Sequence, residues 1–130
     1  MKCEGIIHAG LARELARLRH TDTFVISDAG LPVPADVPCI DLGYRYGQPS
    51  FADVSSAVLH EVVIEHSWVS TDIEQANPEV LAHILSLGLQ PERIDHRSFK
   101  QRVHNVSFVI RTGEATKFAN LLCRAGVAFG

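Results

Sequence analysis

Residues 20–34 constrain the fold of this chain more than any other segment. The segment begins with His20 behind a helical pattern, passes through the apolar triplet Phe24-Val25-Ile26, and reaches Asp28 before Ala-Gly and two prolines. A strand that leads into a carboxylate and a Gly/Pro-rich loop is typical of open α/β sheets, whose ligand sites lie beyond the carboxyl ends of the strands. Asp and Gly also dominate ordinary turns. The segment therefore predicts either a binding loop or a plain turn after the first strand.

The rest of the chain alternates between helical and strand patterns. Ser50 and Asn77 are suited to cap two of the helices, Pro78 to open the second of them, and Gly88 to end it. Alternation of this kind predicts a three-layer α/β/α sandwich around a largely parallel central sheet. We expect strands at 23–27, 39–42, 66–71, 93–95 and 106–110, an edge strand at 127–129, and helices at 8–19, 51–62, 78–87, 96–103 and 117–125.

Size and composition narrow the class of protein. A chain of 130 residues, 46% of them hydrophobic, predicts one folded domain over residues 1–130. The net charge of −3 argues against a nucleic-acid or anionic-membrane partner. No stretch approaches the ~18 apolar residues of a membrane span, and the N-terminal residues do not read as a signal peptide. Three scattered cysteines suggest free thiols, so a cytoplasmic protein is expected.

The histidines do not follow a metal-binding pattern. The chain has seven of them, but His60 and His66 are six residues apart and other pairs also lack ligand spacing. The sequence also has no Gly-x-Gly-x-x-Gly or Walker motif and no Gly-x-Ser-x-Gly elbow. We therefore predict neither a metal site nor a nucleotide cofactor.

The candidates that remain are polar residues at the ends of predicted elements. His20 follows the first helix and could donate a proton near neutral pH, or could simply bind the last carbonyls of that helix. His96 and Lys100 are i, i+4 and share a helix face, which could be a solvated face instead of a site. Asn120 falls inside the predicted last helix, where its amide needs a partner. Arg111 and Glu114 are expected to form a structural ion pair.

Several separated segments together resemble the D-ribose pyranase family. They occur in the family's order and span the whole chain, which makes the resemblance specific. The segments are His-Thr-Asp at 20–22, Asp-Ala-Gly-Leu-Pro-Val-Pro at 28–34, Gln-Pro-Ser-Phe at 48–51, His-Arg-Ser-Phe-Lys at 96–100, Arg-Thr-Gly-Glu-Ala-Thr-Lys-Phe-Ala-Asn at 111–120 and Ala-Gly-Val at 125–127.

The resemblance implies a cofactor-free sugar isomerase. Such an enzyme interconverts the pyranose and furanose forms of D-ribose and exchanges its anomers. It thereby provides the form of the sugar that a kinase uses in ribose catabolism. Related fucose mutarotases act on another monosaccharide, and a non-catalytic sugar-binding regulatory subunit is a further alternative. The motif match assigns the proton donor to His20 and sugar binding to Asp28, His96, Lys100, Phe118, Ala119 and Asn120.

The resemblance also implies a decamer of two stacked five-membered rings, with the sugar sites between neighbouring subunits. The spacing of His20 and Asp28 agrees with a shared site, because the five extended residues between them span about 17 Å. Phe118 stands where the family commonly has Tyr, and residues 43–48 differ from the family's usual Lys-Pro-Gly surroundings. Residues 31–34, Leu-Pro-Val-Pro, are closer to the ribose branch than to the fucose branch.

Overall fold

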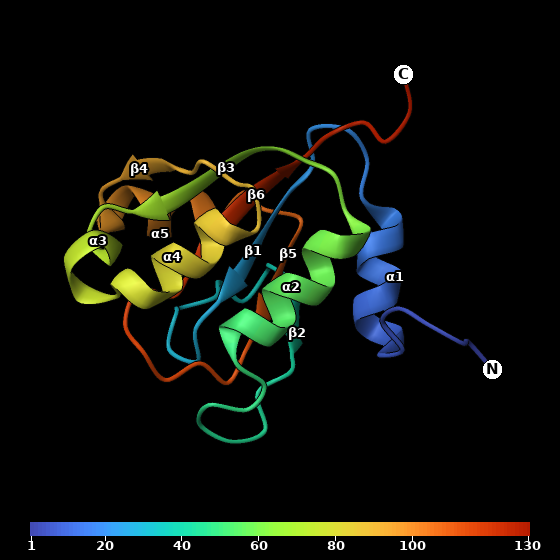
Figure 1. Cartoon of the computed structure of the whole chain (residues 1–130), viewed down its shortest axis with the longest axis horizontal. Coiled ribbons are helices and arrows are strands. Elements are labelled where there is room, and N and C mark those ends of the chain that lie inside the picture. The colour runs from blue at the N-terminus through green and yellow to red at the C-terminus, as the bar shows by residue number, and fades with distance from the viewer.

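A six-stranded sheet in the order β2-β5-β1-β6-β3-β4 is the framework of the computed structural model, which describes residues 1–130 (Figure 1). Five strands run in the same direction, and β6 lies antiparallel between β1 and β3. The predicted α/β class with a largely parallel sheet is confirmed. The strands are β1 (Thr23–Ser27), β2 (Cys39–Asp41), β3 (Ile64–Ser70), β4 (Glu92–Ile94), β5 (Phe108–Arg111) and β6 (Leu121–Ala125).

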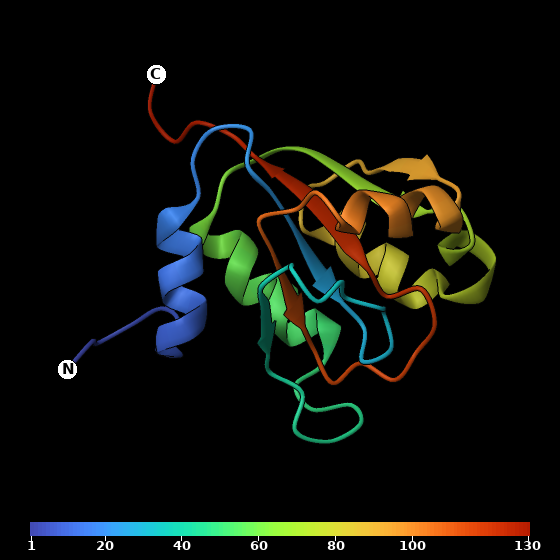
Figure 2. The same ribbon diagram turned by 180° about the vertical axis from the view of Figure 1, so that it is seen from behind.

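Helices cover both faces of the sheet, as the three-layer prediction requires. The helices are α1 (Ala9–Arg17), α2 (Phe51–Glu61), α3 (Ile73–Ala76), α4 (Pro78–Ser86) and α5 (His96–Val103). The core on one face contains residues of α1, α2 and α4. Helix α5 lies on the opposite face (Figure 2). The core there contains Phe99 and Val103 of α5, together with Leu31 and Val37 from the loop after β1. No helix is both long enough and apolar enough to cross a bilayer.

Strand β1 lies at the centre of both cores. Phe24 and Ile26 face the core with α2 and α4, and Val25 faces the core with α5. All three are fully buried, and the Phe24 ring stacks on Phe108 of β5 with centroids 5.3 Å apart. A strand buried on both sides is a rigid element, because its side chains are packed at close to crystal density. The loop that follows β1 therefore starts from a fixed point.

The expected helix over 117–125 is wrong, because residues 121–125 form strand β6. Leu121 and Cys123 enter one core and Leu122 enters the other, so this short apolar run is buried on both faces. Such a run has no periodicity that separates strand from helix. Asn120 precedes the strand, and the expected edge strand at 127–129 is not formed. The short helix α3 was not predicted.

The predicted helix caps are confirmed. The Ser50 hydroxyl accepts a hydrogen bond from the backbone N–H of Asp53 at 3.0 Å. The Asn77 side chain accepts one from the backbone N–H of Val80 at 3.3 Å, with Pro78 at the first helical position. Gly88 follows α4 with φ +86°, a left-handed conformation that glycine adopts without steric cost.

Candidate functional site

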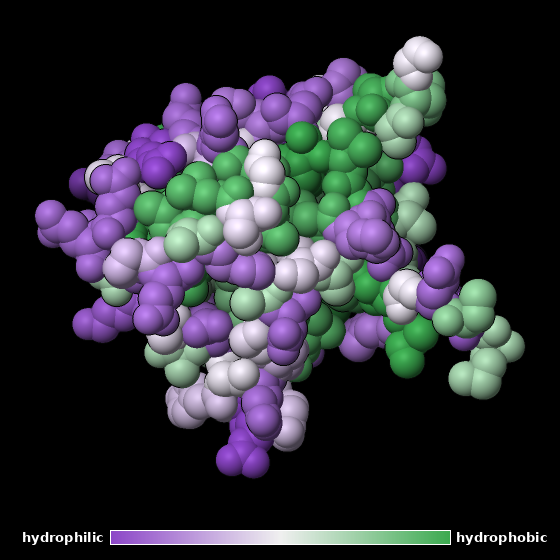
Figure 3. All heavy atoms as spheres, in the orientation of Figure 1, coloured by the Kyte–Doolittle hydropathy of each residue, from purple (hydrophilic) through white to green (hydrophobic).

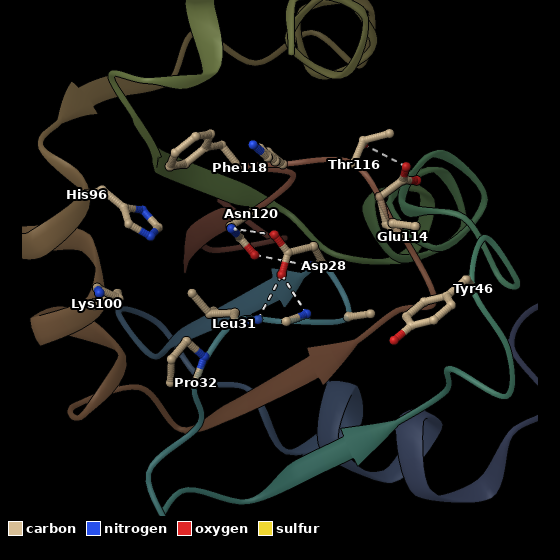
Figure 4. A pocket seen from close by; sticks show the side chains of 14 residues that line it. Asp28, Leu31, Pro32, Tyr46, His96, Lys100, Glu114, Thr116, Phe118 and Asn120 are labelled. Atoms are coloured by element: carbon tan, nitrogen blue, oxygen red, sulfur yellow. Dashed lines mark hydrogen bonds between the residues drawn. The ribbon is translucent and has the colours of Figure 1, made fainter. Parts of the chain in front are cut away.

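A pocket of about 630 Å³ opens at the edge of the sheet where the parallel strands end (Figure 4). Its wall combines the loop after β1, the start of α5, the segment between β5 and β6, and one side chain from the loop after β2. This edge is where open α/β sheets place their ligands. The lining residues are Asp28, Ala29, Gly30, Leu31, Pro32, Tyr46, His96, Lys100, Glu114, Ala115, Thr116, Lys117, Phe118 and Asn120.

Asp28 both forms a turn and lines the pocket. Its Oδ1 accepts hydrogen bonds from the backbone N–H of Gly30 at 2.9 Å and of Leu31 at 2.8 Å. Its Oδ2 accepts one from Asn120 Nδ2 at 3.2 Å, and its own N–H donates to Asn120 Oδ1 at 2.9 Å. The turn reading of this segment is confirmed, and the binding role of Asp28 stays a prediction. A carboxylate has about four acceptor positions, so one remains for a ligand hydroxyl.

Hydrogen bonds from Thr112, the residue after β5, fix the point where Asp28 leaves the sheet. The backbone N–H of Thr112 donates to the Ser27 carbonyl at 3.0 Å, and the Thr112 hydroxyl donates to the same oxygen at 2.7 Å. Both side chains are fully buried. The Asp28 carboxylate is therefore held by its neighbours before any ligand binds, which is the preorganisation that a specific polar site needs.

Helix α5 brings His96 and Lys100 to the pocket on one face, as their spacing predicts (Figure 4). The His96 ring meets the Phe118 ring edge-on, with centroids 4.9 Å apart. Neither ring nitrogen of His96 has a hydrogen bond within the chain, and Nδ1 is buried. Lys100 forms no ion pair. Both residues therefore keep free hydrogen-bonding groups for a ligand. The buried His96 Nδ1 is notable because buried polar atoms in folded proteins nearly always have a hydrogen-bond partner.

The start of α5 depends on Asp95, whose carboxylate accepts from the Ser98 hydroxyl at 2.7 Å and from its backbone N–H at 2.9 Å. These two bonds lower the pKa of Asp95 below its usual range. A lowered folded-state pKa adds stability above the pKa of the unfolded carboxyl, and that stability is lost as the pH falls through the folded value.

Asp95→Ala should therefore lower the melting temperature at pH 7, because α5 loses its N-cap. The difference from the wild type should shrink as the pH falls below the usual range of an aspartate. Thermal unfolding between pH 7 and pH 3 measures this, with Asp36→Ala as the control, since Asp36 is exposed and makes no side-chain hydrogen bond. A difference that does not change with pH would contradict the capping role.

Glu114 serves a different partner from the one expected. Its Oε1 accepts from the backbone N–H of Phe51 at 2.9 Å, at the start of α2, and its Oε2 accepts from the Thr116 hydroxyl at 2.7 Å. Arg111 instead pairs with Asp41 of the neighbouring β2, with Nη1 and Oδ2 3.0 Å apart. The expected Arg111–Glu114 ion pair is wrong, because the first residue ends a strand whose neighbour supplies a carboxylate in register.

Tyr46 lines the pocket from the loop of residues 43–48 and was not singled out from the sequence. This loop packs directly on Gly113: a Cβ there would lie 2.5 Å from the Gln48 carbonyl oxygen and 2.6 Å from that of Arg45. Only glycine permits this approach. The length of the connection between β1 and α2 was the available signal, since loops this long in a small domain are usually functional.

The segment 118–120 contributes in two ways. Phe118 has φ +59°, which turns the chain into β6 and presents the ring to the pocket beside His96. Asn120 is nearly fully buried and fixes Asp28 as described. Ala119 is fully buried, and its side chain belongs to the core with α2 and α4, not to the pocket wall. Its role in sugar binding stays a prediction.

His20 lies away from the pocket. It precedes β1 at the opposite end from Asp28, and its side chain is 54% exposed, with Nε2 2.9 Å from Glu65 Oε2. It does not bind the last carbonyls of α1; Arg19 does, donating from Nη1 to Ala16 O at 3.1 Å and Leu18 O at 2.9 Å. One chain thus gathers Asp28, His96, Lys100, Phe118 and Asn120, but not His20.

The side chains of the types that bind metal ions are scattered over the structure. No group of three or more His, Cys, Asp or Glu residues is placed to hold a metal ion. The acid–base groups that the pocket offers are the Asp28 carboxylate, the His96 imidazole and the Lys100 ammonium. These groups, with the Asn120 amide, suit a neutral polyhydroxy ligand, which needs many fixed donors and acceptors.

A family model described as the RbsD / FucU transport protein family matches residues 1–128. The chain belongs to this family. Among curated proteins, the RbsD / FucU chain described here is 42% identical to the D-ribose pyranase of Exiguobacterium sibiricum over 129 residues, covering 99% of this chain and 100% of that one. It is 44% identical to the D-ribose pyranase of Bacillus licheniformis at the same coverage. The resemblance noted in the sequence is confirmed.

Two solved structures are similar to this chain over nearly its full length. Bacillus subtilis RbsD complexed with D-ribose superimposes with a TM-score of 0.94 at 40% identity, covering 99% of this chain and 100% of that chain. The fucose mutarotase of Streptococcus pneumoniae, solved with L-fucose, gives a TM-score of 0.80 at 18% identity over 95% of each chain. The second match shows the shared fold alone.

Proposed function

We propose that this protein is a D-ribose pyranase, which interconverts the pyranose and furanose forms of D-ribose and their anomers by opening and reclosing the sugar ring. The observation that carries the proposal is the close structural match, over the full length, to a relative solved with D-ribose. The polar pocket at the carboxyl edge of the sheet supports it, because its groups are of the kind that bind a sugar.

The chemistry requires proton transfers and no redox change. Opening a cyclic hemiacetal needs a base for the anomeric hydroxyl and an acid for the ring oxygen; another hydroxyl then closes on the carbonyl. Each positioned acid or base contributes about 10²–10⁴-fold. In our proposal His20 is the proton donor. Asp28, through its free acceptor position, binds the sugar with His96, Lys100 and the 118–120 segment.

We infer that His20 reaches the sugar from a neighbouring subunit. Within one chain His20 and Asp28 occupy opposite ends of β1, so a single subunit does not supply both to one pentose. An exposed apolar area extends over α4 and toward the C-terminal end of the chain, and supports self-association (Figure 3). A decamer of two five-membered rings is the assembly we propose, with a cytoplasmic location and one domain over residues 1–130.

The proposal is tested by NMR saturation transfer on D-ribose. Irradiating a pyranose resonance should attenuate a furanose resonance faster with protein than without, as a ring-opening catalyst requires. Binding of ribose without transfer would indicate a non-catalytic sugar-binding subunit. Transfer between forms of L-fucose but not of D-ribose would indicate a fucose-type mutarotase.

Phe118→Tyr should tighten ribose binding by about 0.5–1.5 kcal/mol, the net value of one hydrogen bond. The Phe118 ring lies at the pocket wall against His96, so an added hydroxyl enters the pocket and not the core. Titration calorimetry with D-ribose measures the change, and Phe129→Tyr at the exposed C-terminal end is the matched control. Unchanged or weaker affinity would show that this segment binds the sugar through its backbone only.

A further inference from the structure

We propose that Glu65 is the positioning residue for His20, and that it makes Nδ1 of the imidazole the nitrogen that exchanges protons with the sugar. The inference rests on the proposed function, because it takes His20 as the proton donor. It concerns a carboxylate on β3 that is not among the residues that line the pocket.

The backbone around His20 is fixed by its neighbours. The N–H of Thr21 donates to the Ala125 carbonyl of β6 at 3.0 Å, and the N–H of Asp22 donates to the Arg19 carbonyl at 3.0 Å. The Asp22 carboxylate in turn accepts from the N–H of Arg19 at 2.8 Å. The main chain of this turn is therefore held, and only the rotation of the imidazole is left to be set.

Glu65 sets that rotation, and is itself held from a second side. Its Oε2 lies 2.9 Å from His20 Nε2, and its Oε1 accepts from Arg124 Nε of the adjacent β6 at 2.7 Å. The Arg124 guanidinium lies over the Trp68 ring, 5.6 Å from its centroid, and the indole N–H donates to Glu92 Oε2 at 2.6 Å. Because Arg124 holds Glu65 through Oε1, the carboxylate can orient the His20 imidazole through Oε2.

This arrangement selects one tautomer of His20. An ionised carboxylate has no hydrogen to donate, so the His20 nitrogen that faces Glu65 must carry one. The hydrogen bond from His20, and less strongly that from Arg124, lower the pKa of Glu65, so the carboxylate stays ionised near neutral pH. Nε2 therefore keeps its hydrogen, and Nδ1, which makes no hydrogen bond in the chain, is free to take up and release a proton.

Glu65→Gln reverses this selection without changing the size of the side chain. Arg124 Nε can only donate, so the new amide oxygen faces Arg124 and the amide NH₂ faces His20. Nε2 must then accept, and the hydrogen moves to Nδ1. A histidine held in the wrong tautomer loses its acid–base function although its position is kept.

The test combines ¹⁵N-histidine NMR with ribose exchange kinetics. The His20 signals, assigned by their loss in His20→Ala, should show the Nε2–H tautomer in the wild type and the Nδ1–H tautomer in Glu65→Gln. The maximal exchange rate should fall at least about 10-fold in Glu65→Gln, with the ribose concentration for half-maximal rate changed little. Glu74→Gln is the matched control: Glu74 forms a similar ion pair with Arg93 at 2.9 Å, with no histidine beside it.

Two results would overturn the role of Glu65 alone, and a third would overturn the proposed function as well. An active wild type whose His20 carries its hydrogen on Nδ1 overturns the role of Glu65, and this needs no variant to fold. An active wild type matched in rate by a folded Glu65→Gln protein does the same. A wild type that shows no ribose exchange overturns the proposed function itself, and the Glu65 inference with it.

Discussion

Replacing His20 by alanine should lower the rate of ribose ring exchange by about 10²-fold or more and leave the melting temperature nearly unchanged. The rate falls because the ring oxygen loses its proposed proton donor. Stability is kept because the side chain is half exposed and its one hydrogen bond is to Glu65 at the surface, where solvent screens the pair and leaves it little effect on folding. The cap of α1 is also unaffected, since Arg19 binds the last carbonyls.

Saturation-transfer rates and thermal unfolding, measured on the same preparation, separate the catalytic role from a structural one. His60→Ala is a suitable control: His60 is an exposed histidine on α2 whose side chain makes no hydrogen bond. His60→Ala should exchange ribose at the wild-type rate. A stable His20→Ala protein with full activity would remove His20 from the mechanism.

Co-expression of His20→Ala with Asp28→Asn should regenerate activity that neither variant has alone. If His20 of one subunit meets Asp28 of the next, a random mixed ring contains wild-type pairs at about a quarter of its sites. Asp28→Asn should be inactive because it loses the carboxylate. It also places the NH₂ group of the new side chain against the NH₂ group of Asn120. The Asn120 amide cannot turn over to relieve this, because its Oδ1 already accepts a hydrogen bond from the backbone N–H of residue 28.

Differently tagged chains, purified in tandem, show whether mixed assemblies form. Mixing two preparations of the same variant is the control, and it should stay inactive. Tandem-purified mixed assemblies as inactive as their parents would show that His20 and Asp28 act within one chain, or that His20 does not act at all.

The elements that the sequence predicted well are those with strong local signals. The first strand and the helix over 96–103 have the predicted bounds, because an apolar triplet between polar ends specifies β1 and Asp95 caps α5. The last strand was misassigned because its partners β1 and β3 are distant in the chain, and its residues are buried on both faces. Whether such a segment forms a strand or a helix is decided by its pairing partners and not by its local propensity.

The pocket was predictable only in part. Asp28 could be placed from its own strand and loop, whereas His96, Lys100, Phe118 and Asn120 were linked to it by family resemblance. Glu114 was misassigned because its partner, the Phe51 N–H, is 63 residues away. Tyr46 was missed because its position depends on the close packing of its loop on Gly113, a tertiary contact with no local signal.

In the proposed function, this chain speeds ribose ring exchange with its own side chains. The most direct measurement is the pyranose–furanose exchange rate of D-ribose by saturation transfer, as a function of protein concentration and in the presence of a strong chelator. We predict a rate that rises in proportion to protein concentration and is the same with and without chelator. A rate equal to that of ribose alone, or one lost in chelator and restored by a divalent ion, would contradict the account.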